Sequence, residues 1–139
     1  MKIVEVGEKK ISLPEDLLYS KYHTWVKEED DLLIVGITDY AVQELGDIEV
    51  VDLIDALDLE VAPGEEPVEE IRIESNKAIG DIFAPAKGVI TEINEELESD
   101  PTRLNEDCYE AWLFKMEPSE WESDKENLLN VDKYADILE

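Results

Sequence analysis

Short apolar segments separated by turn residues, with no long helical segment between them, constrain the fold of this chain most strongly. Residues 25–37, 68–83 and 88–94 are rich in the β-branched and aromatic side chains that are typical of strands. The turns are marked by proline and glycine, at Pro63, Gly64, Pro85 and Gly88. Parallel strands need crossover connections of about a dozen residues or more, and nothing in the sequence resembles such a unit. We therefore predict a mainly β fold, a compact barrel or sandwich, with short flanking helices.

The predicted strands are arranged as hairpins followed by single strands. Residues 25–37 form a hairpin around the acidic turn EEDD, and residues 68–83 form a second hairpin with Lys77 at its apex. A further strand begins at Gly88, and residues 109–116 supply the last one. This order indicates antiparallel pairing.

Capping residues predict short helices beside these strands. Thr38 and Asp39 can cap the segment DYAVQEL, which Gly46 ends. Ser119 and Asn130 each precede apolar residues at helical spacing, so two short helices are expected to close the chain.

The length of 139 residues fits one domain with short terminal additions. Residues 1–16 are expected to be a lead-in, in which Pro14 followed by two acids indicates at most a turn or two of helix. Residues 17–118 form the predicted β domain, and residues 119–139 form the C-terminal helices packed on the same domain.

Acidic residues dominate the charge, because 38 Asp and Glu against 12 Lys and Arg give a net charge of -26. Such a charge repels the phosphates of nucleic acids and anionic membrane surfaces, so neither is an expected partner. The simplest interpretation of the acidic runs is solvated surface. A sharper hypothesis is that their field steers basic partner proteins toward this one.

The sequence lacks the common signatures of enzymes and metal sites. It has no Gly-rich phosphate loop, no HExxH and no GxSxG. Cys108 is the only cysteine, which rules out an intramolecular disulfide and a cysteine metal cluster. No apolar run has the length of a signal peptide core or a membrane span, so we expect a cytoplasmic protein.

Lys77 is a lone cation at the apex of a predicted hairpin. Asn76 tolerates the positive φ of a tight turn and fits its first central position, which leaves Lys77 at the second, where glycine would be easier on the backbone. An ordinary surface lysine is the simplest interpretation. The surrounding residues ESNKAIGDIFAPAKG, however, resemble the attachment hairpin of lipoyl and biotinyl carrier domains.

The wider chain narrows this resemblance to one family. Several segments occur in the order found in the glycine-cleavage H protein, namely YSKYHTW (19–25), VGITDYA (35–41), LGD (45–47), ESNKA (74–78), DIFAP (81–85) and LN (104–105). The resemblance covers roughly residues 17 to 138, and no single piece carries it alone.

The resemblance implies a β barrel-sandwich hybrid that carries lipoate as an amide on Lys77, attached by a lipoate ligase or a lipoyl transferase. It implies a carrier without catalytic activity of its own, expected to be a monomer. Its partners would be a pyridoxal-phosphate-dependent glycine decarboxylase, a folate-dependent aminomethyltransferase and dihydrolipoamide dehydrogenase. The carrier would move an aminomethyl intermediate between them.

The resemblance also implies a set of cofactor-binding residues, which are Lys77, Glu74, Asn76, Ala78, Asp81 and His23. His23 and Trp25 match residues that usually bracket a glutamate of the cleft that shelters the loaded arm. Here Thr24 occupies that position, and a hydroxyl is a poor substitute for a carboxylate beside an ammonium group. In addition, ESNKA replaces the usual ESVKA, and a glycine-containing run is shortened to CYEAW.

These departures leave a second carrier function open, that of an H-like lipoate-binding protein that carries sulfur intermediates for a heterodisulfide-reductase-like sulfur-oxidation system. A biotin carrier is disfavoured, because biotin sites normally centre on a methionine-flanked lysine. An enzyme with Lys77 or Cys108 as nucleophile and a purely structural acidic module are also compatible with the residues. Lys87, in the following turn, is the rival acceptor.

Several residues have a structural interpretation beside the functional one. A single histidine such as His23 usually packs or hydrogen-bonds, and a single cysteine such as Cys108 usually behaves as a small buried hydrophobe, although it could trap a thiol. We expect the strand aromatics to be core, namely Trp25, Phe83, Trp112 and Phe114. Trp121 is expected to fasten a C-terminal helix.

Overall fold

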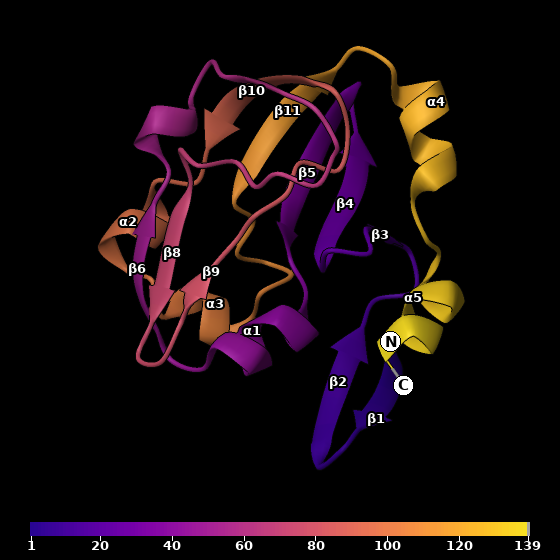
Figure 1. Ribbon diagram of the computed structural model, residues 1–139, viewed down its shortest axis with the longest axis vertical. Helices are drawn as coiled ribbons and strands as arrows, with labels where there is room; N and C mark the ends of the chain where they lie inside the picture. The colour runs from indigo at the N-terminus through magenta and orange to yellow at the C-terminus, as the bar shows by residue number, and fades with distance from the viewer. Residues whose placement is uncertain (139) are drawn as a thin grey trace.

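The computed structural model describes residues 1–138. Two antiparallel sheets face each other, as Figure 1 shows. The larger sheet has the order β3-β4-β5-β11-β10-β7, with β3 Leu18–Tyr19, β4 Thr24–Glu29, β5 Leu32–Ile37, β11 Phe114–Pro118, β10 Gly88–Ile93 and β7 Glu60–Val61. The smaller has the order β6-β8-β9, with β6 Ile48–Asp52, β8 Arg72–Ser75 and β9 Ile79–Gly80. The predicted mainly β, barrel-sandwich fold is confirmed, although no strand pairing within residues 1–138 closes the two sheets into one barrel.

Short helices connect and cover the sheets. They are α1 Asp39–Leu45, the 3-10 turn Ile54–Ala56, α2 Glu96–Ser99, α3 Arg103–Glu106, α4 Trp121–Asp124, the 3-10 turn Lys125–Asn127 and α5 Val131–Leu138. The prediction for α1 is confirmed, because the Thr38 hydroxyl accepts the Ala41 N–H and Gly46 ends the helix at a φ of 88°. The hairpin predicted over residues 25–37 is also confirmed as β4 and β5.

An additional hairpin occupies the N-terminus, where the sequence predicted only a lead-in. Strands β1 Lys2–Val6 and β2 Lys9–Leu13 pair as a separate sheet that packs near α5 (Figure 1). After Pro14 the chain makes a single turn at residues 15–16 and forms no helix, which is within the prediction of at most a turn or two. The Tyr19 hydroxyl donates to the Pro14 carbonyl at 2.6 Å, and Tyr19 exchanges backbone hydrogen bonds with Leu129, so the chain is drawn into the extended strand β3.

The C-terminal predictions hold in part. The strand predicted over residues 109–116 begins only at Phe114, because the Trp112 carbonyl accepts from Asn94 Nδ2 and not from a neighbouring strand. Two helices follow as expected, and Asn130 Oδ1 accepts the Lys133 N–H. Ser119 does not cap α4, since its hydroxyl donates to the Lys87 carbonyl.

Two hydrophobic clusters hold these parts together. The larger lies between the two main sheets and includes Ile73, Ile90 and Phe114. The smaller joins the N-terminal hairpin, α5 and Trp25. Trp25 and Phe114 are core residues, as predicted, whereas the remaining two strand aromatics lie at the margin: Phe83 stacks on Tyr22, and the Trp112 ring lies 4.9 Å from Lys115 Nζ.

Candidate functional site

The turn between β8 and β9 presents Lys77, and the Ser75 side chain organises it. The Ser75 hydroxyl accepts the Lys77 N–H at 3.2 Å and the Ala78 N–H at 2.9 Å, while the Ser75 N–H donates to the Ala78 carbonyl at 2.8 Å. The expectation that Asn76 adopts a positive φ is wrong, because the non-glycine residues with positive φ in residues 1–138 lie elsewhere. A hydroxyl that accepts both N–H groups makes the left-handed turn unnecessary.

The return side of this hairpin is shorter than predicted. Strand β9 contains only Ile79 and Gly80, after which the chain leaves the sheet, and the Ile82 carbonyl accepts the Val68 N–H. This departure buries Ile82 and leaves Asp81 exposed. Lys77 therefore lies at the apex of a hairpin whose second strand is held by only two residue pairs with β8.

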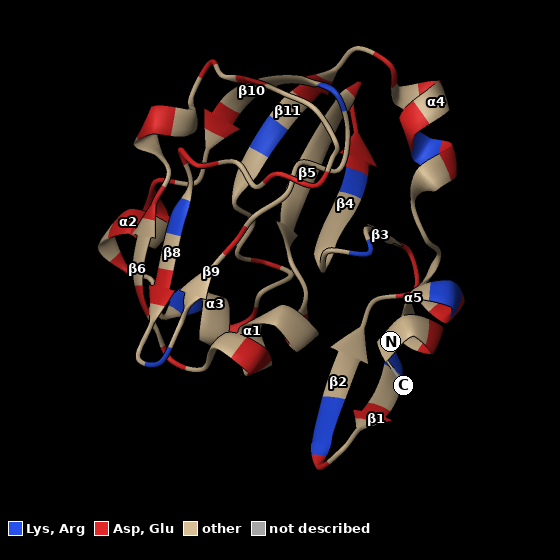
Figure 2. Cartoon of the chain, in the orientation of Figure 1, with Lys and Arg blue, Asp and Glu red and all other residues tan. Residues whose placement is uncertain are grey.

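Lys77 is exposed, and its Nζ forms no ion pair within residues 1–138, although the chain carries 38 acidic residues. Figure 2 shows acidic residues on most elements, with basic residues scattered among them. The Lys77 stem lies over Gly46, where a Cβ atom would be 3.3 Å from Lys77 Cε. The amine is thus accessible while its stem rests on the backbone of the neighbouring loop.

The rival acceptor Lys87 is engaged with α4. Its Nζ lies 3.5 Å from Glu120 Oε1, and its backbone N–H donates to Asp124 Oδ2 at 2.8 Å. Lys87 therefore belongs to a structural contact between the turn before β10 and the C-terminal segment.

The structure groups the remaining candidate residues in two places. Glu74, Asn76 and Ala78 lie in the Lys77 hairpin, and Glu74 faces Arg72 at 3.9 Å. His23 lies in the β3–β4 connection, outside the Lys77 hairpin. The candidate residues thus form one group in the hairpin and a histidine on a different connection.

His23 is part of a partly buried polar cluster with the C-terminal helix. Its Nδ1 lies 2.7 Å from the Tyr134 hydroxyl, which in turn lies 2.8 Å from the Thr38 hydroxyl. Its ring lies 4.6 Å from the Tyr40 ring. These contacts give the histidine a structural role in joining α5 to the start of α1.

A pH titration of His23 tests this description. Burial lowers the pKa of His23, and the Glu44 carboxylate only partly offsets that effect. Because an unfolded histidine titrates near about 6.5, the unfolded chain binds the proton first as pH falls, so this contribution to the free energy of unfolding is complete above that pH and is lost below it. The chain has one histidine, so a single ring resonance should titrate with a midpoint below that value.

His23→Gln should remove this dependence of stability on pH. Chemical unfolding at several pH values between about 5 and 7.5 measures the slope in both proteins. A midpoint at or above the unfolded value would contradict the description.

Thr24 and Cys108 are both buried and take part in structural hydrogen bonds. Thr24 is 1% exposed, and its hydroxyl lies 2.6 Å from the Ser20 hydroxyl, so it closes the β3–β4 connection. Cys108 is buried, burial raises the pKa of its thiol, and its backbone carbonyl accepts the Trp25 indole N–H. A buried, protonated thiol is a poor nucleophile, which weighs against Cys108 as a reactive group.

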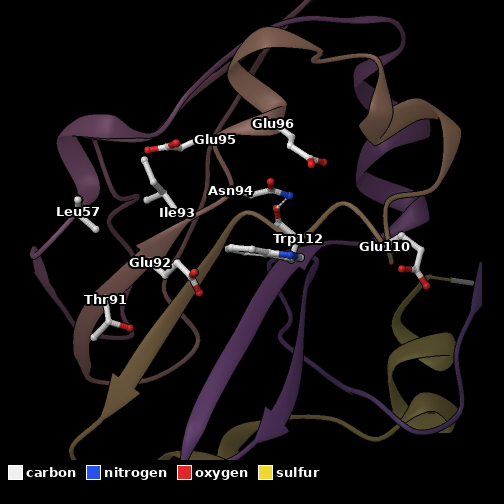
Figure 3. Close-up of a pocket in the computed structure, with 9 residues that line it drawn as sticks. All are labelled: Leu57, Thr91, Glu92, Ile93, Asn94, Glu95, Glu96, Glu110 and Trp112. Atoms are coloured by element: carbon white, nitrogen blue, oxygen red, sulfur yellow. Dashed lines mark hydrogen bonds between the residues drawn. The ribbon is translucent and has the colours of Figure 1, made fainter.

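A groove lined mainly by polar residues lies apart from Lys77. It has a volume of about 550 Å³ between the end of β10, α2 and Trp112, as Figure 3 shows. Its lining includes four glutamates, at positions Glu92, Glu95, Glu96 and Glu110. No group of His, Cys, Asp and Glu side chains that could hold a metal ion occurs in residues 1–138. The same part of the chain contains no helix with the length and apolar character needed to cross a membrane.

Two residues that support the Lys77 turn were not predicted from the sequence. Asn105 Nδ2 donates to the Gly46 carbonyl at 2.8 Å, and the Ile48 N–H donates to Asn105 Oδ1 at 2.9 Å. Gly46 lies against Asn76 and Lys77. Gly46 and Asn105 fall within the LGD and LN segments of the resemblance, which was the available signal.

Comparison with known proteins agrees with the fold. A family model described as Glycine cleavage H-protein matches residues 17–139. The probable glycine cleavage system H protein of Pyrococcus abyssi is 43% identical over 137 residues, covering 98% of each chain. The glycine cleavage system H protein of Oceanobacillus iheyensis is 44% identical over 131 residues, covering 93% of this chain and 99% of that one.

A crystal structure of a glycine cleavage system H protein from Mycobacterium marinum has a TM-score of 0.74 and 32% identity, covering 90% of this chain and 98% of that one. The fold is therefore the barrel-sandwich fold of lipoyl-domain-like carrier proteins. The chain belongs to the glycine-cleavage H-protein family, and it is a lipoyl carrier of the H-protein type. None of these relatives supports the sulfur-oxidation function.

Proposed function

We propose that Lys77 is the lipoyl attachment site and that the protein acts only as a carrier. The observation that carries this proposal is the exposed amine without an ion pair among the described residues, at the apex of the hairpin. The hydrogen-bonded His23 and the buried Cys108 lack that access. A lysine amine is also the group from which a stable lipoyl amide forms.

The hairpin fits the covalent step. The partner ligase or transferase deprotonates Lys77, Nζ attacks the carbonyl carbon of the activated lipoyl group, and the activating group leaves as the amide forms. The Ser75 hydroxyl keeps the turn in shape during this approach. Lys77 is therefore a substrate of the modifying enzyme.

Attached lipoate supplies the dithiolane chemistry, and this chain supplies position and docking. We propose that the cargo is the aminomethyl group of the glycine-cleavage reaction. The partners are then glycine decarboxylase, aminomethyltransferase and dihydrolipoamide dehydrogenase. Tethering the arm raises the effective concentration of its end at each docked partner. The many acidic residues along the chain, coloured red in Figure 2, suit basic docking faces on those enzymes.

We also propose an oligomeric state and a cellular compartment. The protein works as a monomer in the cytoplasm, where the buried thiol of Cys108 stays reduced. The Thr24 hydroxyl, bonded to Ser20, is a structural group and not a replacement for a carboxylate in an arm-sheltering cleft.

Incubation with a lipoate ligase, ATP and lipoate tests the attachment. Intact mass should increase by one lipoyl group per chain, and peptide fragmentation should locate it on Lys77. The loaded protein should then support glycine decarboxylation with the partner enzymes. A modification on Lys87, or a biotinyl group attached preferentially by a biotin ligase, would overturn the proposal.

A further inference from the structure

The Lys77 turn depends on support from outside its own hairpin. Strand β9 has two residues, pairs within residues 1–138 with β8 alone and lies at the edge of the smaller sheet. Its first residue, Ile79, is 70% exposed. A hairpin with one such weak strand does not fix the direction of its apex by itself.

The external support comes from the loop between α1 and β6. The Asn76 N–H donates to the Asp47 carbonyl at 3.0 Å, which extends the β6–β8 pairing into the turn beside Lys77. The pairing is irregular at this point, because the register shifts between Ile48 and Val50. The position of the Asp47 carbonyl therefore depends on what holds the loop.

Asn105 holds that loop on both sides of Asp47. Its Nδ2 donates to the Gly46 carbonyl at 2.8 Å, and its Oδ1 accepts the Ile48 N–H at 2.9 Å. The side-chain amide thus spans the residue that supports the turn. A carboxylate could keep only the second bond, because it has no N–H group to donate.

Gly46 allows the loop between α1 and β6 to contact the Lys77 turn directly. A Cβ atom there would lie 2.9 Å from Asn76 Oδ1 and 3.3 Å from Lys77 Cε, and the φ of 88° disfavours any other residue. The loop and the turn are consequently in contact through both backbone and side chains.

We propose that Asn105 is a positioning residue for lipoylation of Lys77, acting through the Gly46–Ile48 loop that fixes the direction of the turn. This inference rests on Lys77 as the attachment site. The ligase must align Lys77 Nζ with the activated carbonyl carbon in one geometry. A mobile turn adopts that geometry less often than a fixed one.

The test compares Asn105→Asp and Asn105→Ala with Asn94→Asp as a matched control. Asn94 also donates one amide hydrogen bond to a backbone carbonyl, that of Trp112, but it lines the remote groove. At a temperature where all proteins are folded, kcat/KM for lipoylation should fall roughly tenfold in both Asn105 variants, since small misplacements are costly in enzyme-held geometries. The control should stay near wild type.

Two further measurements separate positioning from stability. Acetylation of Lys77 by acetic anhydride, followed by mass spectrometry, should be unchanged, because the amine is exposed without any partner enzyme. Amide hydrogen exchange at Asn76 should accelerate in the Asn105 variants and not in the control.

Gly46→Ala should reproduce the slower lipoylation. This variant tests the loop independently if an Asn105 variant fails to fold.

The outcomes are distinct. Wild-type lipoylation rates in a folded Asn105→Ala protein, or a loss in Asn94→Asp as large as in Asn105→Asp, would overturn the positioning role. Absence of lipoylation on Lys77 in the wild-type protein would instead overturn the proposed attachment site.

Discussion

Replacing Lys77 by arginine is expected to abolish lipoylation while leaving the fold intact. Arginine keeps the positive charge, but its guanidinium is not the amine that forms a stable lipoyl amide. The side chain is exposed and has no ion pair in residues 1–138, so the free energy of unfolding should change by less than about 0.5 kcal/mol. Intact mass after ligase treatment measures lipoylation, and a coupled assay with the partner enzymes measures glycine decarboxylation. Both should fall to background.

Lys87→Arg is the matched control for this experiment. It makes the same chemical change in the neighbouring turn, where the side chain faces Glu120. This variant should accept one lipoyl group at the wild-type rate. A lipoylated Lys77→Arg protein, or a Lys87→Arg protein that cannot be modified, would assign the attachment site to the second turn.

Trp25→Ala is expected to cause the largest loss of stability among the aromatic substitutions. Trp25 is 2% exposed, its indole N–H donates to the Cys108 carbonyl at 3.1 Å, and a Cβ on Gly36 would lie only 2.5 Å from its ring. Truncation leaves a cavity and an unpaired carbonyl, so the free energy of unfolding should fall by about 3–5 kcal/mol. Urea unfolding followed by circular dichroism gives the value.

Trp121→Ala serves as the comparison. Trp121 is half-buried and its indole nitrogen has no hydrogen-bond partner among the described residues, so its removal should cost about 1–2 kcal/mol. Equal losses in the two variants would show that burial of Trp25 and its bond to Cys108 add no more stability than the half-buried Trp121.

The contrast between these two tryptophans illustrates what could be predicted. The sequence predicted both as packing residues from their place on a strand and a helix. Only the folded chain distinguishes them, because the Trp25 bond reaches Cys108, which is 83 residues away in sequence. A residue pattern reports which side chains are apolar, but not which distant carbonyl they meet.

The Lys77 site divides in the same way. The sequence located the lysine at a hairpin apex and, through the resemblance, its family, since turn residues and motif order are short-range signals. It predicted the wrong turn geometry, because it considered the positive-φ turn favoured by Asn76 and not the alternative in which the Ser75 hydroxyl accepts two N–H groups. It also named His23 as a cofactor-binding candidate, and the fold shows that His23 contacts Tyr134, which the sequence did not predict.

The sequence by itself determined the mainly β architecture, helix α1 with its Thr38 cap and the exposed position of Lys77. These features depend on alternation, capping and turn propensity within a few residues. The tertiary structure decided the N-terminal hairpin's place beside α5, the burial of Thr24 and the Asn105 contact with the Gly46 loop. Each of these requires segments far apart in sequence to meet, and which segments meet is set by packing of the whole core.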